Sequence, residues 1–178
     1  MSQLETLEAL RGRDFPIQLM VRMSPPWVFI DEIRRFTESF CACACPGQDR
    51  EAQVALAVHE LMQNAVPHAH GEEVELCLEV SREADAIAIR VTNRCSDEDY
   101  QELKGRIERM NGEPDALAHY VRMMREHPAS TRGGLGLARV RFEAQLEISV
   151  RREAGRVIVE AAGPLRAPRL PAVGGSHG

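Results

Sequence analysis

The sequence is poor in aromatic residues, which make up 4% of its 178 positions, and it has no excess of positive charge, because its formal net charge is −5. Few aromatic side chains leave little surface on which bases could stack. A net negative charge opposes binding to the phosphate backbone of nucleic acids. We therefore expect no nucleic acid among the partners of this protein.

Long apolar runs are also missing. No stretch reaches the roughly 18 residues that a membrane-spanning helix needs. Residues 1–14 alternate charged residues with leucine and contain no apolar signal segment. We therefore expect a cytoplasmic protein that does not associate with a membrane.

The chain has few cysteines, and their number, five, is odd. Such a count, without a signal peptide, does not suggest a disulfide framework. Three cysteines alternate with alanine in the segment 41–45. Residues two apart point to different sides of a helix, and no CxxC pair or nearby histidine completes a zinc site. We interpret this segment as small buried residues at the end of a helix.

The composition is that of an ordinary globular protein, with 44% apolar and 28% charged residues. A chain of this length can form one domain with a sizeable core. Proline and glycine dominate from Pro164 onward. We expect a single domain over residues 1–163 and a flexible tail over residues 164–178.

Hydrophobic periodicity predicts five strands and five helices. The expected strands cover residues 15–23, 74–80, 86–92, 146–152 and 156–161, and the expected helices cover residues 25–43, 49–66, 97–110, 114–126 and 135–142. This order predicts an α+β fold, a two-layer sandwich in which a mixed or antiparallel sheet of about five strands carries helices on one face.

Two of these elements carry further predictions. Pro16 favours an edge position for the first strand, and an exposed edge would permit a homodimer. In the first helix, six apolar residues recur at helical spacing and predict its buried face. They are Trp27, Ile30, Ile33, Phe36, Phe40 and Cys43.

The segment from His59 to Ala65 places two polar residues, Glu60 and Asn64, four positions apart and therefore on one face of the second predicted helix. A carboxylate can polarise a hydroxyl group or a water molecule, and an amide oxygen can hold Mg²⁺. An asparagine in a largely apolar helix is costly unless it bonds to something. Glu60 is thus a candidate catalytic residue and Asn64 a candidate metal ligand, whereas the alternative for Glu60 is a solvated helix charge.

A glycine-rich loop, Arg132-Gly133-Gly134-Leu135-Gly136-Leu137, opens the last predicted helix. Bare backbone N–H groups at a helix N-terminus can cradle phosphates. The guanidinium group of Arg132 could contact a phosphate as well. Together with Glu60 and Asn64, this loop predicts a nucleotide site, although the loop alone could be an ordinary turn.

The two motifs and the order of elements resemble the histidine-kinase-like ATPases of the GHKL superfamily, which share the Bergerat ATP-binding fold. The superfamily's N-box, Glu-x-x-x-Asn on a helix, is matched within residues 58–68 in a form similar to that of anti-sigma serine kinases, including the trailing His68. Its second glycine box is matched by residues 132–137. The resemblance covers roughly residues 15–162. Within the superfamily, the chain is most similar to the SiaB-type protein kinase family, in the pairs Thr92-Asn93, Leu103-Lys104 and Met110-Asn111.

The resemblance implies a cytoplasmic protein serine/threonine kinase with ATP and Mg²⁺ as cofactors, acting in a bacterial partner-switching system on a small regulatory protein. It implies that Glu60 orients or deprotonates the attacking hydroxyl group and that Asn64 holds Mg²⁺. It assigns residues 113–132 to the position of the ATP lid. The remaining nucleotide-binding residues that it implies are His68, Asn93, Arg132, Gly133, Gly134, Leu135, Gly136 and Leu137.

The chain also departs from the superfamily pattern. The first glycine box centres on Asp-x-Gly, whose aspartate accepts a hydrogen bond from the adenine amino group, whereas this chain has Asn93-Arg94-Cys95. An asparagine offers an acceptor oxygen and also donates. His68 could instead cap the end of its helix.

Three functions stay open at this point. A kinase is favoured by the retained Glu60. A catalytically inactive scaffold that sequesters a regulatory partner is favoured by the altered first glycine box. Simple ATP hydrolysis, with Glu60 activating water, is the third.

Overall fold

A computed structural model describes residues 16–24, 27–69, 73–126 and 134–166. The strands are β1 (Ile17–Met23), β2 (Val74–Ser81), β3 (Ala86–Asn93), β4 (Glu147–Glu153) and β5 (Arg156–Pro164). The helices are α2 (Ile30–Ala44), α3 (Glu51–Ala65), α4 (Asp97–Asn111), α5 (Ala116–Glu126) and α6 (Leu135–Phe142), with short 3-10 helices η1 (Trp27–Phe29) and η2 (Val66–His68). Each predicted strand and helix is confirmed in type, with most ends shifted by no more than three residues. The exception is the start of the first helix: α2 begins at Ile30 after the 3-10 helix η1, and residues 25–26 lie outside the described part.

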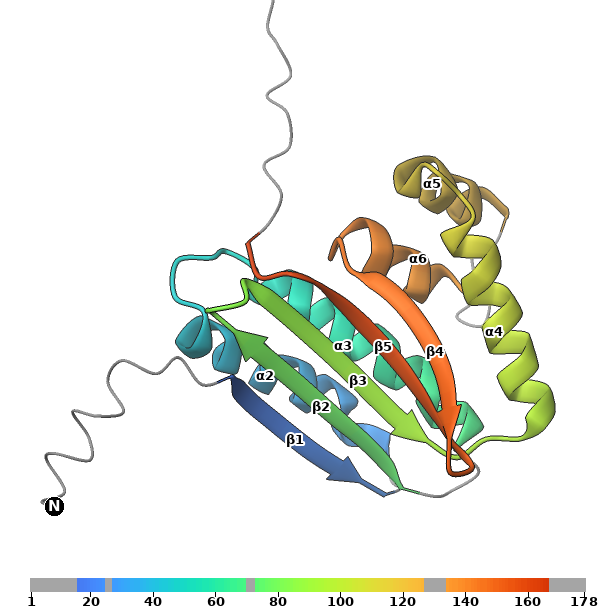
Figure 1. Ribbon diagram of the computed structural model, residues 1–178, viewed down its shortest axis with the longest axis horizontal. Helices are drawn as coiled ribbons and strands as arrows, with labels where there is room; N and C mark the ends of the chain where they lie inside the picture. The colour runs from blue at the N-terminus through green and yellow to red at the C-terminus, as the bar shows by residue number, and fades with distance from the viewer. Residues whose placement is uncertain (1–15, 25–26, 70–72, 127–133, 167–178) are drawn as a thin grey trace, which may run out of the picture.

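The five strands form one sheet in the order β1-β2-β3-β5-β4, and every pairing is antiparallel (Figure 1). The predicted α+β fold is confirmed, and of the two predicted sheet types the structure has the antiparallel one. β1 lies at an edge, as the sequence predicted. Whether that edge pairs with a second copy of the chain stays a prediction.

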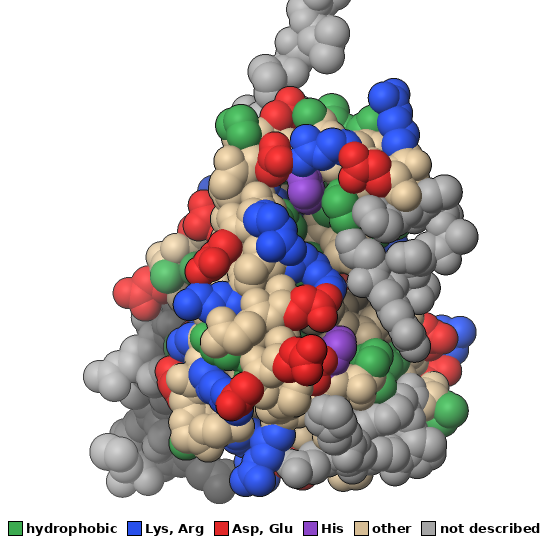
Figure 2. Space-filling view, turned by 90° about the vertical axis from the view of Figure 1, so that its right-hand side faces the viewer, with side chains coloured by type: hydrophobic (Ala, Val, Ile, Leu, Met, Phe, Trp, Pro, Cys, Tyr) green, Lys and Arg blue, Asp and Glu red, His purple; other side chains and the backbone are tan. Residues whose placement is uncertain are grey.

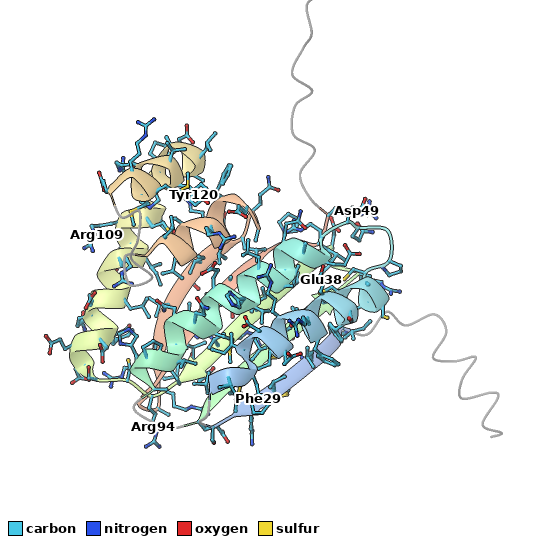
Figure 3. All side chains as sticks on the ribbon, turned by 180° about the vertical axis from the view of Figure 1, so that it is seen from behind. Phe29, Glu38, Asp49, Arg94, Arg109 and Tyr120 are labelled. Atoms are coloured by element: carbon cyan, nitrogen blue, oxygen red, sulfur yellow. The ribbon has the colours of Figure 1, made fainter. Side chains whose placement is uncertain are left out.

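The alternation of side chains along each strand gives the sheet one apolar and one polar face. Leu76 and Leu78 of β2 pair with Val91 and Ile89 of β3, and all four are fully buried. On the opposite face, ion pairs such as Arg90–Glu160 (2.6 Å) join neighbouring strands. α2 and α3 lie side by side over the apolar face (Figure 3).

α3 is the central helix of this layer, because it contacts α2, α6 and β3. Its core residues Val58, Leu61 and Met62 are at most 1% exposed. The helix ends at Ala65, two residues before Pro67, and the chain continues as the 3-10 helix η2. Proline has no N–H group and cannot extend the helix, so the sequence itself fixes where the Glu60–Asn64 face stops.

The predicted buried face of α2 is wrong at two positions. Phe36 is 55% exposed and Cys43 is exposed, whereas Thr37, Cys41 and Ala44 are buried. The helix is therefore rotated by about one residue from the predicted face. Small residues at this contact allow α2 to pack closely against α3, and the Thr37 hydroxyl donates to Ile33 O at 2.8 Å, which satisfies the buried polar group.

The other apolar residues of the predicted stripe, Ile30, Ile33 and Phe40, are partly buried against the core. Of the alternating cysteines, Cys41 and Cys45 are buried and Cys43 is exposed, so the interpretation as small buried residues holds for two of the three. Burial raises the pKa of Cys41 to about 12, which keeps its thiol protonated at neutral pH.

Two residues of the predicted tail belong to the fold. Pro164 pairs with Ala86, and Leu165 is buried with its N–H group donating to Asp85 O at 2.9 Å. The rest of the predicted tail, residues 167–178, lies outside the described part. Within the described ranges, no helix is long and apolar enough to cross a membrane.

The face over α4 carries interleaved basic and acidic side chains (Figure 2). Arg106 pairs with Glu102 at 2.6 Å, and Lys104 lies 3.8 Å from Glu108. These pairs follow the i,i+4 spacing that brings side chains together on a helix. Opposite charges are thus balanced locally along this helix.

Candidate functional site

Two neighbouring hollows lie beside the C-terminal half of α3 and share one residue, Asn64. The first, here named the α4 pocket, is narrow, with a cavity volume of about 20 Å³, and is lined by Asn64, Ala65, His68, Asn93, Cys95, Asp99, Glu102, Leu103, Arg106, Val157 and Val159. The second, named the glycine pocket, has a cavity volume of about 390 Å³ and is lined by Ile30, Glu60, Gln63, Asn64, Val66, Pro67, Gly134, Gly136 and Leu137.

Glu60 is held in place on the α6 side of the glycine pocket. Its side chain is only 10% exposed, and Oε1 accepts a hydrogen bond from Arg139 Nη1 at 2.6 Å. Its other oxygen, Oε2, lies so close to Gly136 that a Cβ there would come nearer than the 3.0 Å that real Cβ contacts respect. The alternative of a solvated helix charge is therefore wrong, and only a glycine at position 136 leaves room for this carboxylate.

The glycine loop places the N-terminus of α6 at the same pocket. Gly134 has a φ of +84°, in the left-handed region, and precedes α6 as its N-cap. The first described bond into α6 runs from Ala138 N–H to Gly134 O at 3.1 Å. The N–H groups of Leu135, Gly136 and Leu137 thus have no acceptor inside the helix, which is the arrangement that suits an anion.

Not every predicted residue of the loop contributes in the same way. The Leu137 side chain is 2% exposed and belongs to the core, so only its backbone can serve a ligand. Leu135 opens α6 and does not line either pocket. Arg132 and Gly133 lie outside the described residues.

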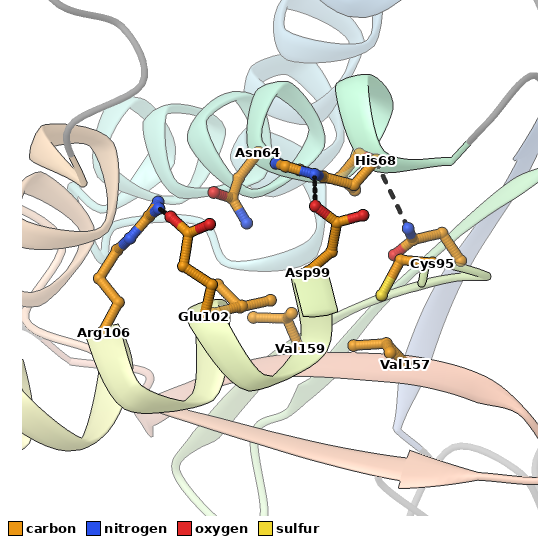
Figure 4. Close-up of a pocket in the computed structure, with 11 residues that line it drawn as sticks. Asn64, His68, Cys95, Asp99, Glu102, Arg106, Val157 and Val159 are labelled. Carbon is orange, nitrogen blue, oxygen red and sulfur yellow. Dashed lines mark hydrogen bonds and ion pairs between the residues drawn. The ribbon is translucent and has the colours of Figure 1, made fainter. Parts of the chain in front are cut away.

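Asn93 ends β3 in the α4 pocket and is 4% exposed. Its amide Nδ2 donates to Arg94 O at 3.1 Å and, more weakly, to Ala65 O at 3.5 Å. With the nitrogen so placed, the amide presents its carbonyl oxygen as an acceptor on the other side. Val157 and Val159 of β5 provide apolar surface in the same pocket (Figure 4).

His68 joins η2 to α4 across this pocket. Its Nδ1 lies 2.9 Å from Asp99 Oδ1 (Figure 4), and Asp99 also accepts from the Ser96 hydroxyl at 2.6 Å. The alternative role of His68 as a helix cap is not what the structure shows, because its ring bonds to another helix. Ser96 caps α4 as well, since its Oγ accepts from Asp99 N–H at 3.0 Å.

With this geometry in place, a comparison with protein families decides the class. The model of one family, described as the histidine kinase-like ATPase domain, matches residues 29–161.

The chain belongs to this family.

The predicted resemblance to histidine-kinase-like ATPases is thus confirmed. Among solved structures, the SiaB–SiaC complex from Pseudomonas aeruginosa contains a chain that superposes with a TM-score of 0.61 at 18% sequence identity, covering 91% of this chain and 97% of that one. This likeness shows a shared fold. No curated protein sequence matches the chain.

The site has features that suit a nucleoside triphosphate, the type of ligand that an ATPase domain binds. The first turn of α6 has N–H groups without an acceptor inside the helix, and Gly134 and Gly136 leave space that a Cβ would fill. Asn64 lines both pockets and carries a neutral amide oxygen, a type of group that Mg²⁺ accepts as a ligand.

Sequence analysis missed two groups of residues at this site. Four residues of α4, namely Asp99, Glu102, Leu103 and Arg106, line the α4 pocket, and a Cβ on Gly134 would meet Arg106 Cδ at 2.9 Å. Their spacing places all four on one face of the helix, which could have been predicted from the sequence. The spacing does not show which part of the protein that face contacts. The second omission is Arg139, whose contact with Glu60 spans 79 positions and has no local signal.

One of the residues that depart from the family pattern, Cys95, lies at the candidate site. Cys95, which stands where the first glycine box has its glycine, lines the α4 pocket. Burial and the neighbouring Asp99 raise the pKa of its thiol, so it stays protonated at neutral pH. Its Sγ donates weakly to Ser96 O at 3.4 Å.

We expect Asn93→Asp, which restores the family's aspartate, to destabilise this protein rather than improve its site. The change removes the donor to Arg94 O and Ala65 O and sets a carboxylate oxygen against two carbonyl oxygens in a buried position. The loss of unfolding free energy should be about 1–3 kcal/mol at neutral pH. It should shrink at low pH, where the protonated carboxyl group can donate again.

Chemical denaturation at pH 7 and pH 4 measures this loss. Asn111→Asp is a matched comparison, because Asn111 Nδ2 also donates to a backbone carbonyl, Ile148 O at 2.8 Å, outside the two pockets. An Asn93→Asp variant as stable as the natural protein at both pH values would contradict the assigned role of the amide nitrogen.

Proposed function

We propose that this protein is a cytoplasmic protein serine/threonine kinase of a bacterial partner-switching system, using Mg²⁺ and ATP to phosphorylate a small regulatory protein. The observation that carries the proposal is that Glu60, Asn64, Gly134 and Gly136 line one cavity. Membership of an ATPase-domain family supports a nucleotide ligand. The fold shared with a chain of the SiaB–SiaC complex supports a protein partner.

The two pockets suit different parts of the nucleotide. The α4 pocket offers apolar surface from Val157 and Val159 and the acceptor oxygen of Asn93 to the adenine base, and with a cavity volume of about 20 Å³ it must widen to admit that base. The α6 N-terminus suits the phosphates, with His68 and Arg106 as further candidate contacts. Asn64 would hold Mg²⁺ between them, and the bound ion would offset the charge of the phosphates.

Glu60 is placed to act on the attacking hydroxyl group of the partner. Arg139 occupies its Oε1, and its Oε2 lies beside Gly136 in the glycine pocket. A carboxylate held in this way can orient the hydroxyl group or accept its proton. In this proposal the acceptor is a serine or threonine of another small protein.

A second function, a scaffold that sequesters the partner without catalysis, is favoured by one observation. Asn93-Arg94-Cys95 replaces Asp-x-Gly, and the Cys95 side chain takes up space in the α4 pocket. A pocket narrowed in this way would bind the base less well. The scaffold would then keep the fold and the partner surface while losing nucleotide affinity.

Isothermal titration with ATP and Mg²⁺ separates the two functions. We expect the natural protein to bind, and Asn64→Ala to lose about tenfold or more in affinity, because one metal ligand is missing. With EDTA present in both titrations, the natural protein and the variant should bind ATP with the same affinity, because neither then holds Mg²⁺.

Asn111→Ala is the control, because it removes the same amide group at a position outside both pockets. If the natural protein does not bind ATP at millimolar concentration, the kinase assignment is wrong and the scaffold function is favoured. Equal, EDTA-sensitive binding by Asn64→Ala would remove Asn64 from the metal site and leave the nucleotide assignment standing.

A further inference from the structure

A carboxylate beside a triphosphate creates an electrostatic conflict. Glu60 lines the glycine pocket, where the proposed function places the phosphates, and it is nearly buried. Like charges repel strongly where water is excluded. An uncompensated Glu60 would therefore oppose nucleotide binding, so something must offset its charge before the nucleotide arrives.

Arg139 of α6 is the group that lies against Glu60. Its Nη1 donates to Glu60 Oε1 at 2.6 Å, and its Nε donates to Glu143 Oε1 at 3.1 Å one turn further along the helix. Two carboxylates thus hold one planar guanidinium group through different nitrogens. Such a fork fixes the position of an arginine more firmly than a single contact does.

Tyr120 of helix α5 lies near this group. It interacts with Glu143 and Arg139, and its ring stacks on Phe142 with centroids 5.4 Å apart. Burial alone would lower the pKa of Arg139, but the hydrogen bond to Glu143 and the charge of Glu60 outweigh it and raise the pKa. The guanidinium group is therefore always charged, and side chains of α3 and α6 hold it in place.

We propose that Arg139 is a positioning residue that makes nucleotide binding compatible with the Glu60 carboxylate. It offsets the charge of Glu60 towards the phosphates, and by occupying Oε1 it leaves Oε2 on the Gly136 side of the pocket. Arg139 does not line the glycine pocket itself, so its effect on the nucleotide passes through Glu60. This inference rests on the proposed function of the same site.

A double-mutant cycle on ATP–Mg²⁺ affinity tests this role by isothermal titration. Arg139→Met should weaken binding by about tenfold, because the carboxylate is then uncompensated beside the phosphates. Glu60→Gln should bind at least as tightly as the natural protein. The double variant Glu60→Gln/Arg139→Met should return to within about threefold of Glu60→Gln, because no carboxylate charge is left to offset.

Two further variants control for charge and folding. Arg139→Lys keeps the positive charge beside Glu60 but loses the planar fork, so it should recover part of the affinity that Arg139→Met loses. Arg151→Met removes an arginine that also pairs with two glutamates, Glu153 at 2.7 Å and Glu160 at 3.5 Å, but on the outer face of the sheet. It should leave affinity unchanged, and circular dichroism melting curves show which variants are folded at the titration temperature.

The outcomes separate this proposal from the function on which it rests. If the natural protein binds ATP and the loss in Arg139→Met persists in the Glu60→Gln background, Arg139 acts on the nucleotide directly and the proposal is wrong. It is also wrong if Arg139→Met is folded and binds as tightly as the natural protein. If the natural protein itself does not bind ATP, the proposed function fails and this inference fails with it.

Discussion

Glu60→Gln is expected to keep ATP binding and to lower phosphoryl transfer by a factor of about 10²–10⁴, the usual contribution of a positioned general base. Arg139 Nη1 donates to Glu60 Oε1 at 2.6 Å. Glutamine has nearly the same shape as glutamate, and its amide oxygen can accept the same hydrogen bond. It fits beside Gly136 and leaves the fold intact. What it lacks is a group that can take a proton from the attacking hydroxyl.

Two measurements on the same preparation check this result. Titration with ATP and Mg²⁺ reports binding, and transfer of label from γ-labelled ATP to a co-purified partner protein reports catalysis. Glu108→Gln is the control, because Glu108 is an exposed carboxylate on α4 with only a 3.8 Å contact to Lys104. A Glu60→Gln variant with full transfer activity would remove Glu60 from the reaction and leave the nucleotide site unaffected.

Gly136→Ala is expected to abolish detectable nucleotide binding, a loss of about 100-fold or more, and to destabilise the protein as well. Its Cβ would overlap Glu60 Oε2 and press on Glu60 Cδ at 3.3 Å. Glu60 cannot move away freely, because Arg139 holds its other oxygen. Either the carboxylate or the first turn of α6 must shift, and both belong to the proposed phosphate site. Overpacking of this kind typically costs about 1–3 kcal/mol.

Gly105→Ala is the matched glycine variant. At position 105 in α4, the nearest atom to an added Cβ is the flexible end of the Arg109 side chain, at 3.3 Å. Alanine favours a helix interior over glycine by about 1 kcal/mol, so this variant should be slightly more stable and should bind ATP normally. Thermal melts and titrations of both variants decide the matter. Normal binding by Gly136→Ala would show that the described position of Glu60 is not required.

Both predictions depend on one physical feature, a nearly buried carboxylate on a helix whose other side packs into the core. α3 buries Val58, Leu61 and Met62 against the sheet, and Glu60 lies between those turns towards α6. A buried charge is tolerated only when it is paired and hydrogen-bonded. The pair with Arg139 meets that condition, which is why removal of either partner is expected to have consequences beyond the loss of one contact.

The sequence by itself determined the elements and the two motifs. Strict alternation in residues 74–80 gives a half-buried strand, and Pro67 ends the helix that carries Glu60 and Asn64. The four-residue spacing of that pair and the glycines before α6 are local features, and local periodicity determines them. These sufficed for the fold class, and they named the candidate site residues, whose roles stay predictions.

Only the tertiary structure decided which residues meet across these elements. It rotated α2 so that Phe36 faces outward, turned one face of α4 into the wall of a pocket, and brought Arg139 to Glu60 across 79 positions. The faces that helices present to each other are set by close packing of side chains from distant segments. That packing depends on the whole chain at once, and therefore no window of the sequence contains it.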